Sequence, residues 1–149
     1  HLLNIKQDSA KRYISKFFEG YPKVRFFIER IQQMTLRDGY VEMITGRRRR
    51  FHEIKEQKWF GTIQRQSINT KIQGSAADLI KIAMIRLDME LKKLGAYQLV
   101  QIHDELIVEA PVDRIEEVKK VLVDIMEGAL KLRVPLKVNV VEGDKWFKE

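Results

Sequence analysis

Apolar side chains recur at helical spacing through the first quarter of the chain. The spacing predicts one helix that is capped by Asp8 or Ser9 and ends at Gly20. A second helix is expected from Pro22, which suits a first helical turn, to about Arg37, with Gly39 closing it. The apolar residues of these two helices are Tyr13, Ile14, Phe17, Phe18, Val24, Phe27, Ile28 and Ile31.

The next part of the chain predicts a small hairpin and then more helix. Tyr40–Ile44 forms one expected strand, Thr45-Gly46 the turn, and Arg48–Phe51 the partner strand. Glu56–Asn69 indicates a helix with a wide polar face. Ser75–Leu94 indicates a second helix with an apolar stripe, stopped by Gly95.

The last part alternates strand, helix and strand. The most apolar stretch, Tyr97–Ala110, is expected to form a strand pair on both sides of His103-Asp104-Glu105. A helix capped by Asp113 then runs to Leu130, and Leu136–Val141 is the last predicted strand. This order predicts an α+β fold, in which an antiparallel sheet is covered by helices.

Composition narrows the class of protein. The chain has 149 residues, which is the length of one ordinary domain, and it contains no cysteine. Disulfide scaffolds and thiolate metal sites are therefore excluded. No apolar run approaches the ~20 residues that span a bilayer, so no membrane partner is expected. The formal net charge is +7, and residues 1–75 carry 16 Lys/Arg against 7 Asp/Glu. A basic half of this kind favours a polyanionic partner such as nucleic acid.

The predicted acidic hairpin turn carries the sharpest chemistry. Tight hairpins usually use glycine, or Asn or Asp together with glycine, because a positive φ is needed, and His103-Asp104-Glu105 contains no glycine. We therefore expect that these residues occupy the turn because of their side chains and not because of their backbone preference. Adjacent carboxylates at a buried tip would be costly without a cation, and Mg²⁺ prefers such oxygen ligands. The alternative is an exposed tip with solvated charges.

Two basic and polar groups are candidates for nucleic-acid contacts. Arg65, Asn69 and Gln73 are spaced four apart, which in a continuous helix keeps them within about 80° of arc. Such a face could hold a phosphate and contact base edges, or it could be an ordinary solvated face. The run Arg47–Arg50 could contact phosphates or could be a solvated turn.

Several motifs together resemble DNA polymerase family A, the DNA polymerase I type. QIHDEL at 101–106 resembles motif C of that family, and NTKIQGSAAD at 69–78 resembles the helix segment before it. GYVE at 39–42 with TGRRR at 45–49, and PLKVNVVEGDKW at 135–146, resemble two further segments in the same order. The chain departs from the family at Lys71, where proline is usual, and at Ser75, where threonine is common.

The resemblance implies a fold and a set of roles. Residues 1–58 would be the C-terminal part of the fingers subdomain, and residues 59–149 the C-terminal part of the palm. Asp104 would be the motif C ligand of the catalytic magnesium ions, with Glu105 beside the metals and His103 near the primer end. The DNA-binding residues would be Arg65, Asn69, Gln73, Arg47 and Arg48.

The same resemblance implies cofactors and partners. Two Mg²⁺ ions would act with a second aspartate from outside this chain, because the DYSQIELR-like motif A is absent, as is the fingers helix that binds triphosphate. The chain alone is therefore expected to be inactive. The partners would be primer-template DNA, deoxynucleoside triphosphates and the N-terminal remainder of the polymerase. The implied setting is DNA replication and repair in the cytoplasm, for a bacterial or phage type, with an organelle as the alternative.

Other classes of protein fit less well. Phage-type RNA polymerases share the palm plan but typically have HDS in motif C, and reverse transcriptases have two adjacent aspartates. A phosphohydrolase of the HD type would need more histidines than His1 and His52 supply beside His103. The rival from another class is a non-catalytic basic DNA-binding module.

Overall fold

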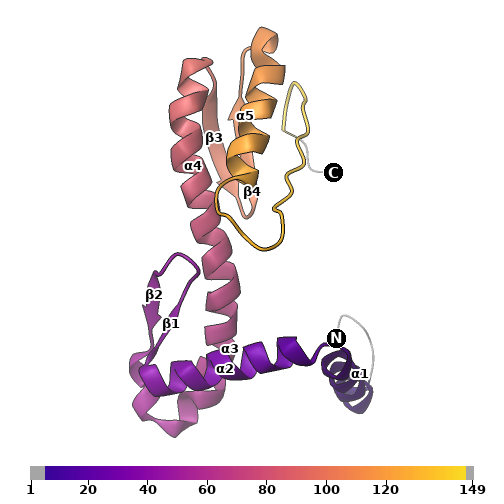
Figure 1. The fold of residues 1–149 in the computed structure, drawn as a ribbon, viewed down its shortest axis with the longest axis vertical. Coiled ribbons are helices and arrows are strands. Elements are labelled where there is room, and N and C mark those ends of the chain that lie inside the picture. Colours follow the sequence, from indigo (N-terminus) through magenta and orange to yellow (C-terminus); the bar gives the residue numbers. More distant parts are fainter. Residues whose placement is uncertain (1–5, 147–149) are drawn as a thin grey trace. The chain divides into compact units, whose positions relative to one another are not determined.

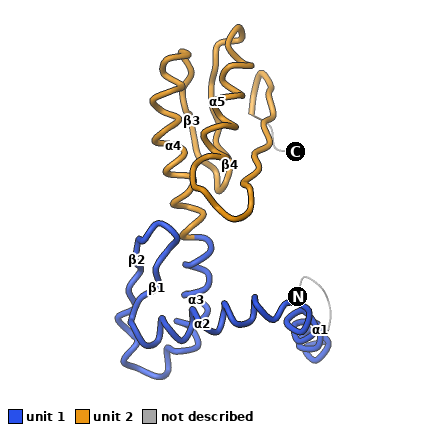
Figure 2. Tube along the Cα trace, in the orientation of Figure 1, with its two compact units in different colours: residues 1–73 blue, residues 74–149 orange. Residues whose placement is uncertain are grey.

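The computed structural model describes residues 6–146, and these form two compact units. One unit is His1–Gln73 and the other is Gly74–Glu149, shown in blue and orange in Figure 2. The division lies within a helical stretch rather than at the predicted 58/59 border between fingers and palm. That border is a division by function, and it stays a prediction.

The first unit consists of helices and one short hairpin, with the hairpin beside α2 and α3 (Figure 1). Its elements are α1 (Gln7–Gly20), α2 (Pro22–Asp38), β1 (Tyr40–Glu42), β2 (Arg48–Arg50) and α3 (Phe60–Asn69), with two 3₁₀ turns before α3 at His52–Lys55 and Gln57–Trp59. Its core consists of Val41, Phe51 and Ile63, with Ile31, Leu36 and Ile54 packed against them. The hairpin is therefore held on one face by the helices α2 and α3.

Glycine sets the junction between α2 and β1. Gly39 takes a φ of 77°, and its N–H donates to the Thr35 carbonyl at 2.9 Å. A side chain at this φ would be strained, whereas glycine has no such cost. The predicted stop at Gly39 places the first hairpin directly after the helix.

The second unit is a helix pair packed on a hairpin. It contains α4 (Ser75–Lys93), β3 (Tyr97–Ile102), β4 (Glu105–Glu109), a 3₁₀ turn (Val112–Arg114) and α5 (Ile115–Glu127). Its core is formed by Leu87, Leu91, Ala96 and Val118, with Leu106 and Val108 of β4 among the residues packed against it. One face of the hairpin is thus covered by α4 and α5.

The end of α4 shows why the chain turns back there. Gly95 has a φ of 68°, and its N–H donates to the Lys92 carbonyl at 3.2 Å. The Ala96 N–H donates to the Leu91 carbonyl at 3.0 Å, and both of these residues are buried in the core. This pair of bonds is a Schellman motif, in which backbone satisfaction and apolar contact end the helix together.

The α+β prediction is confirmed, with two two-stranded antiparallel sheets, β1–β2 and β3–β4. Several local predictions are wrong. The helix α1 begins before Asp8, with Lys6 at its N-cap and no side-chain cap, and α5 begins after Asp113, likewise without one. Here a single 3₁₀ turn takes up the residues expected to cap α5. The third predicted helix begins at Phe60 rather than at Glu56, because 3₁₀ turns occupy the residues before it.

The predicted last strand, Leu136–Val141, is also wrong for the described residues. No backbone ladder forms there. Instead the Val138 N–H donates to the Glu127 carboxylate at 3.1 Å, and Lys137 pairs with the same side chain. The alternating apolar pattern favours a strand, but a strand also needs a neighbouring strand with which to exchange hydrogen bonds.

Candidate active site and nucleic-acid interface

The acidic turn is a two-residue connection at the end of the β3–β4 hairpin. Ile102 pairs with Glu105, so His103 and Asp104 alone form the turn. His103 has a φ of 55°, and it is the only non-glycine residue with a positive φ among residues 6–146. The Gln101 side chain donates to the His103 carbonyl at 2.9 Å. The Gln101 amide is not among the residues predicted from the sequence, although its position two residues before the turn was an available signal.

The left-handed conformation of His103 has a free-energy cost. For a residue with a Cβ it amounts to about 1–2 kcal/mol, and glycine would avoid it. The fold nevertheless keeps histidine there and supports the strained turn with the Gln101 bond. An observed outlier of this kind is a reason to look for a functional role in the side chains.

The environment of the carboxylates corrects one argument from the sequence. His103, Asp104 and Glu105 are all exposed, so water solvates the two carboxylates and burial does not force a cation upon them. No group of three His, Asp or Glu side chains gathers around a common point within residues 6–146. Asp104 offers a hard oxygen ligand that suits Mg²⁺, and the described part of the chain supplies only part of a ligand set.

The predicted polar face lies on α3 and the turn that follows it. Arg65 and Asn69 are exposed and one helical turn apart in α3. Gln73 is exposed too, but it falls in a π-helical turn, Thr70–Gly74, so the predicted continuous α-helix is interrupted. The regular arc of about 80° therefore does not extend to Gln73. Such π turns are frequent at functional sites.

The arginines of β2 differ in what they contact. Arg48 pairs with Glu42 directly across the hairpin at 2.7 Å, and its guanidinium lies 4.5 Å from the centre of the Tyr40 ring. The hydrogen bond to Glu42 raises the pKa of the Arg48 guanidinium, which is charged at any ordinary pH. Arg47 is exposed at the turn. Both residues belong to the same solvent-facing end of the hairpin.

Arg49 has a structural task that the sequence did not indicate. It donates to Thr70 Oγ1 at 2.8 Å and to Gln66 Oε1 at 2.9 Å, and it covers the Phe51 ring at 5.0 Å. Lys71 donates to the Glu42 carbonyl at 2.6 Å. These contacts fix the β1–β2 hairpin to α3 and the π turn. They also give Lys71, which stands where the family usually has proline, a defined role.

The predicted site residues thus fall into two groups. Arg47, Arg48, Arg65, Asn69 and Gln73 belong to the first unit, and His103, Asp104 and Glu105 to the second. The first group is basic and amide-rich, and the second is acidic. The first suits phosphate and base edges, whereas the second suits a divalent cation.

Comparisons with known proteins place the chain in a family. The family model "DNA polymerase family A" matches residues 1–148. DNA polymerase I of Thermus thermophilus, a thermostable enzyme, is 42% identical over 97% of this chain, which spans 18% of that relative. DNA polymerase I of Bacillus caldotenax is 42% identical over 97% of the chain and 17% of the relative.

A solved structure agrees with this assignment. The POL domain of Pol1 from M. smegmatis, in complex with DNA primer-template and dNTP, matches with a TM-score of 0.84 and 33% identity. The match covers 91% of this chain and 25% of that one. The chain belongs to DNA polymerase family A, and it spans less than a fifth of the length of the curated relatives described above.

Proposed function

We propose that the chain forms part of a template-directed DNA polymerase that extends a primer 3′ end by phosphoryl transfer. Family membership supports the reaction class. The observation that carries the proposal is the strained His103-Asp104 turn, which presents exposed carboxylates where the family has motif C. In this assignment residues 1–58 belong to the fingers and residues 59–149 to the palm.

Asp104 would hold catalytic Mg²⁺, with Glu105 as the neighbouring acid. Asp104, together with an aspartate from outside this chain, would hold a pair of magnesium ions, which would supply the charge neutralisation that phosphoryl transfer needs. The contribution of this chain is to hold the carboxylates on a short hairpin whose turn is fixed by Gln101. A stiff support keeps the ligands in place better than a mobile loop. His103, beside them, would contact the primer strand.

The basic unit would hold the primer-template. Arg65, Asn69 and Gln73 supply one guanidinium and two amides for the minor groove, where the acceptors of all base pairs are similar. Such contacts follow the shape of a base pair without depending on its sequence. Arg47 and Arg48 would contact phosphates. For Arg48 this requires sharing its guanidinium with Glu42.

The other partners would be deoxynucleoside triphosphates and the N-terminal remainder of a polymerase. Exposed apolar side chains support the second of these, among them Phe17 on α1, Tyr21 between α1 and α2, and Tyr97 and Leu99 on β3. Contact with the missing part would cover them. The bacterial relatives favour a cytoplasmic setting. Within the described residues no helix is long and apolar enough to cross a membrane.

The test is Asp104→Ala in a reconstituted polymerase that contains these residues. Nucleotide incorporation should fall about a thousandfold, equivalent to about 4 kcal/mol of barrier, while binding of primer-template is retained. Glu109→Ala, at the far end of the strand β4 that follows the turn, is the matched control and should leave incorporation unchanged. Unchanged incorporation in Asp104→Ala would favour the alternative, a non-catalytic basic DNA-binding module.

The isolated chain is expected to incorporate no nucleotide, because one motif C carboxylate pair does not complete a two-metal site. A primer-extension assay on residues 1–149, with and without an added N-terminal polymerase fragment, checks this. Extension by the chain alone would contradict it.

A further inference from the structure

A basic and aromatic stripe runs along the solvent-facing side of α2. Its members recur at intervals of three, four and seven residues, and at 100° per residue they fall within about 80° of arc. All of them are exposed, and the Phe26 side chain is 68% exposed. The stripe consists of Lys23, Phe26, Arg30, Gln33 and Arg37.

Packing does not explain this stripe. The opposite side of α2 carries the buried Thr35 and contributes Ile31 and Leu36 to the core of the unit. A large aromatic ring such as Phe26 usually lies inside or in an interface, where its apolar area leaves water. On α2 the exposed Phe26 lies one helical turn from Lys23 on one side and from Arg30 on the other. The combination therefore calls for a ligand that offers both negative charge and a flat apolar face.

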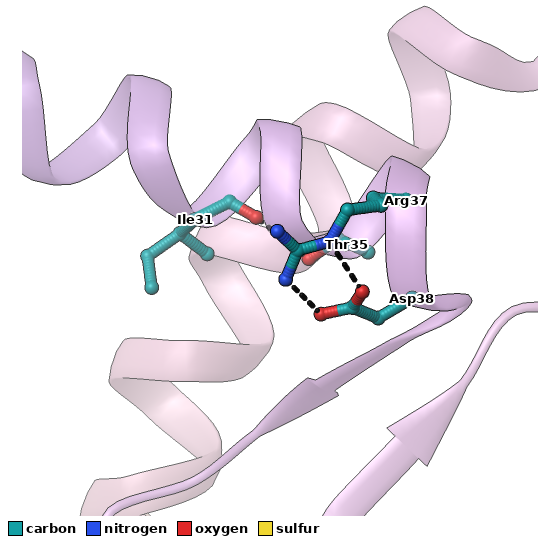
Figure 3. A network of polar contacts seen from close by, with 4 residues as sticks. All are labelled: Ile31, Thr35, Arg37 and Asp38. Carbon is teal, nitrogen blue, oxygen red and sulfur yellow. Dashed lines mark hydrogen bonds and ion pairs between the residues drawn. The ribbon is translucent and has the colours of Figure 1, made fainter.

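The charges of the stripe are mostly available. Lys23 and Arg30 have no carboxylate partner among residues 6–146. Arg37 forms two hydrogen bonds to Asp38, at 2.6 and 2.9 Å (Figure 3), and its side chain is still 73% exposed. Glu29 is engaged by Arg25 at 2.9 Å. The balance along the stripe is positive.

The side chains also shape the surface. Arg30, Gln33, Met34 and Arg37 line a shallow hollow on the helix. Lys23, Arg30 and Arg37 are each seven residues apart, so their backbones follow one another at about 10.5 Å along the helix. A row of cations with an amide between them matches a backbone of phosphates, and an exposed ring can stack on a base.

We propose that this stripe binds a single-stranded stretch of nucleic acid, the unpaired template in the setting of the proposed function, on which this inference rests. Lys23, Arg30 and Arg37 contact phosphates, and Phe26 stacks on an unpaired base. A duplex is the poorer ligand, because its base faces are already stacked on one another and only its phosphates remain for the stripe. An acidic protein surface would satisfy the cations but would leave the ring unused.

The experiment uses the whole chain and one labelled DNA hairpin in two forms, blunt and with a 5′ overhang of about ten thymidines, within the site size of single-strand binders. Binding is measured by fluorescence anisotropy over a range of salt. The chain should bind the overhang form more tightly. Phe26→Leu should weaken that binding about tenfold, in line with the loss of one stacked base, and leave blunt binding unchanged.

The charged residues are tested by Lys23→Gln together with Arg30→Gln. The slope of log affinity against log salt should fall by about 1.4 for the overhang form, about 0.7 for each phosphate contact on a single strand. Arg25→Gln is the matched control on the same helix, on another face and paired with Glu29, and it should change the slope little. Thermal melting checks that each surface variant is folded.

The outcomes separate this inference from the function on which it rests. The proposed single-strand binding by the stripe is overturned if the unaltered chain binds both DNA forms with equal affinity. It is also overturned if the variants lose equal affinity for both forms. Either result leaves the proposed binding of primer-template intact. Absence of binding to either DNA form overturns both proposals.

Discussion

The two hairpins of this chain solve the same backbone problem in different ways. At the end of β1–β2, Gly46 supplies the positive φ of 86°, at little steric cost. At the end of β3–β4, His103 supplies a φ of 55° although a Cβ makes it unfavourable. Glycine makes the first reversal without steric strain. The second turn keeps a residue with a Cβ and the strain that comes with it.

The hairpins also differ in what holds them. Long polar side chains tie the first one to its helices, through Arg49 and Lys71. The second rests mainly on an apolar core, with Leu106 and Val108 packed against α4 and α5, and on one bond from Gln98 to the Met84 carbonyl at 2.9 Å. The loss in the free energy of unfolding on truncating a side chain is therefore expected to differ between the apolar core and the hydrogen-bonded hairpin.

The largest expected effect on stability comes from the core under the second hairpin. Leu87 is fully buried, and Leu87→Ala should lower the free energy of unfolding of that unit by about 3–4 kcal/mol, because it leaves a cavity. Urea unfolding followed by far-UV circular dichroism measures this. Ile85→Ala, on the same helix and 68% exposed, should cost less than about 0.5 kcal/mol. Similar losses in both variants would contradict the assignment of the core.

A smaller loss is expected at the clamp of the first hairpin. Arg49→Met removes two charge-assisted bonds and leaves the hydroxyl of the buried Thr70 without that donor, at a cost of about 1–2 kcal/mol. The Phe51 amide, which bonds to the Gly39 carbonyl, should exchange faster with deuterium. Arg50→Met, at an exposed neighbour, is the control and should leave this exchange rate unchanged. Equal rates in the two variants would mean that Arg49 is no clamp.

The strained turn should separate stability from function. His103→Gly relieves the left-handed strain and should raise the stability of the second unit by about 0.5–1 kcal/mol, since part of the gain is offset by the flexible unfolded chain. In a reconstituted polymerase the same variant should lower incorporation about tenfold, equivalent to about 1.4 kcal/mol. Chemical denaturation and primer extension measure the two quantities. If His103→Gly is neither more stable nor less active, the inferred connection between strain at this turn and function is contradicted.

The smallest effect concerns pH. The backbone N–H of Val138, helped by Lys137, lowers the pKa of the Glu127 carboxyl below its usual value. A depressed carboxyl pKa adds stability above the unfolded pKa of about 4.3, and that stability is lost as pH falls through the lower folded value. Glu127→Gln should therefore weaken the second unit slightly at neutral pH and change little at about pH 2. A loss of equal size at both pH values would show that charge is not involved.

Local chemistry allowed much of the fold to be predicted. Both hairpins, the helix stops at Gly39 and Gly95, and the α+β class follow from spacing and from glycine's access to positive φ. The acidic turn was also visible as a candidate, because residues that do not favour a tight turn occupy one. The roles of its side chains stay predictions that the proposed experiments address.

The tertiary structure decided what depends on distant partners. Arg49 contacts residues 17 and 21 positions away, and nothing in a run of four arginines distinguishes the one that makes these contacts. The exposure of Asp104 and the unpaired course of residues 136–141 likewise depend on what packs beside them. By itself the sequence determined where the chain turns, because φ preferences and hydrophobic spacing act between near neighbours. Only the folded molecule decided which polar groups are used internally, because those contacts join segments that the sequence keeps apart.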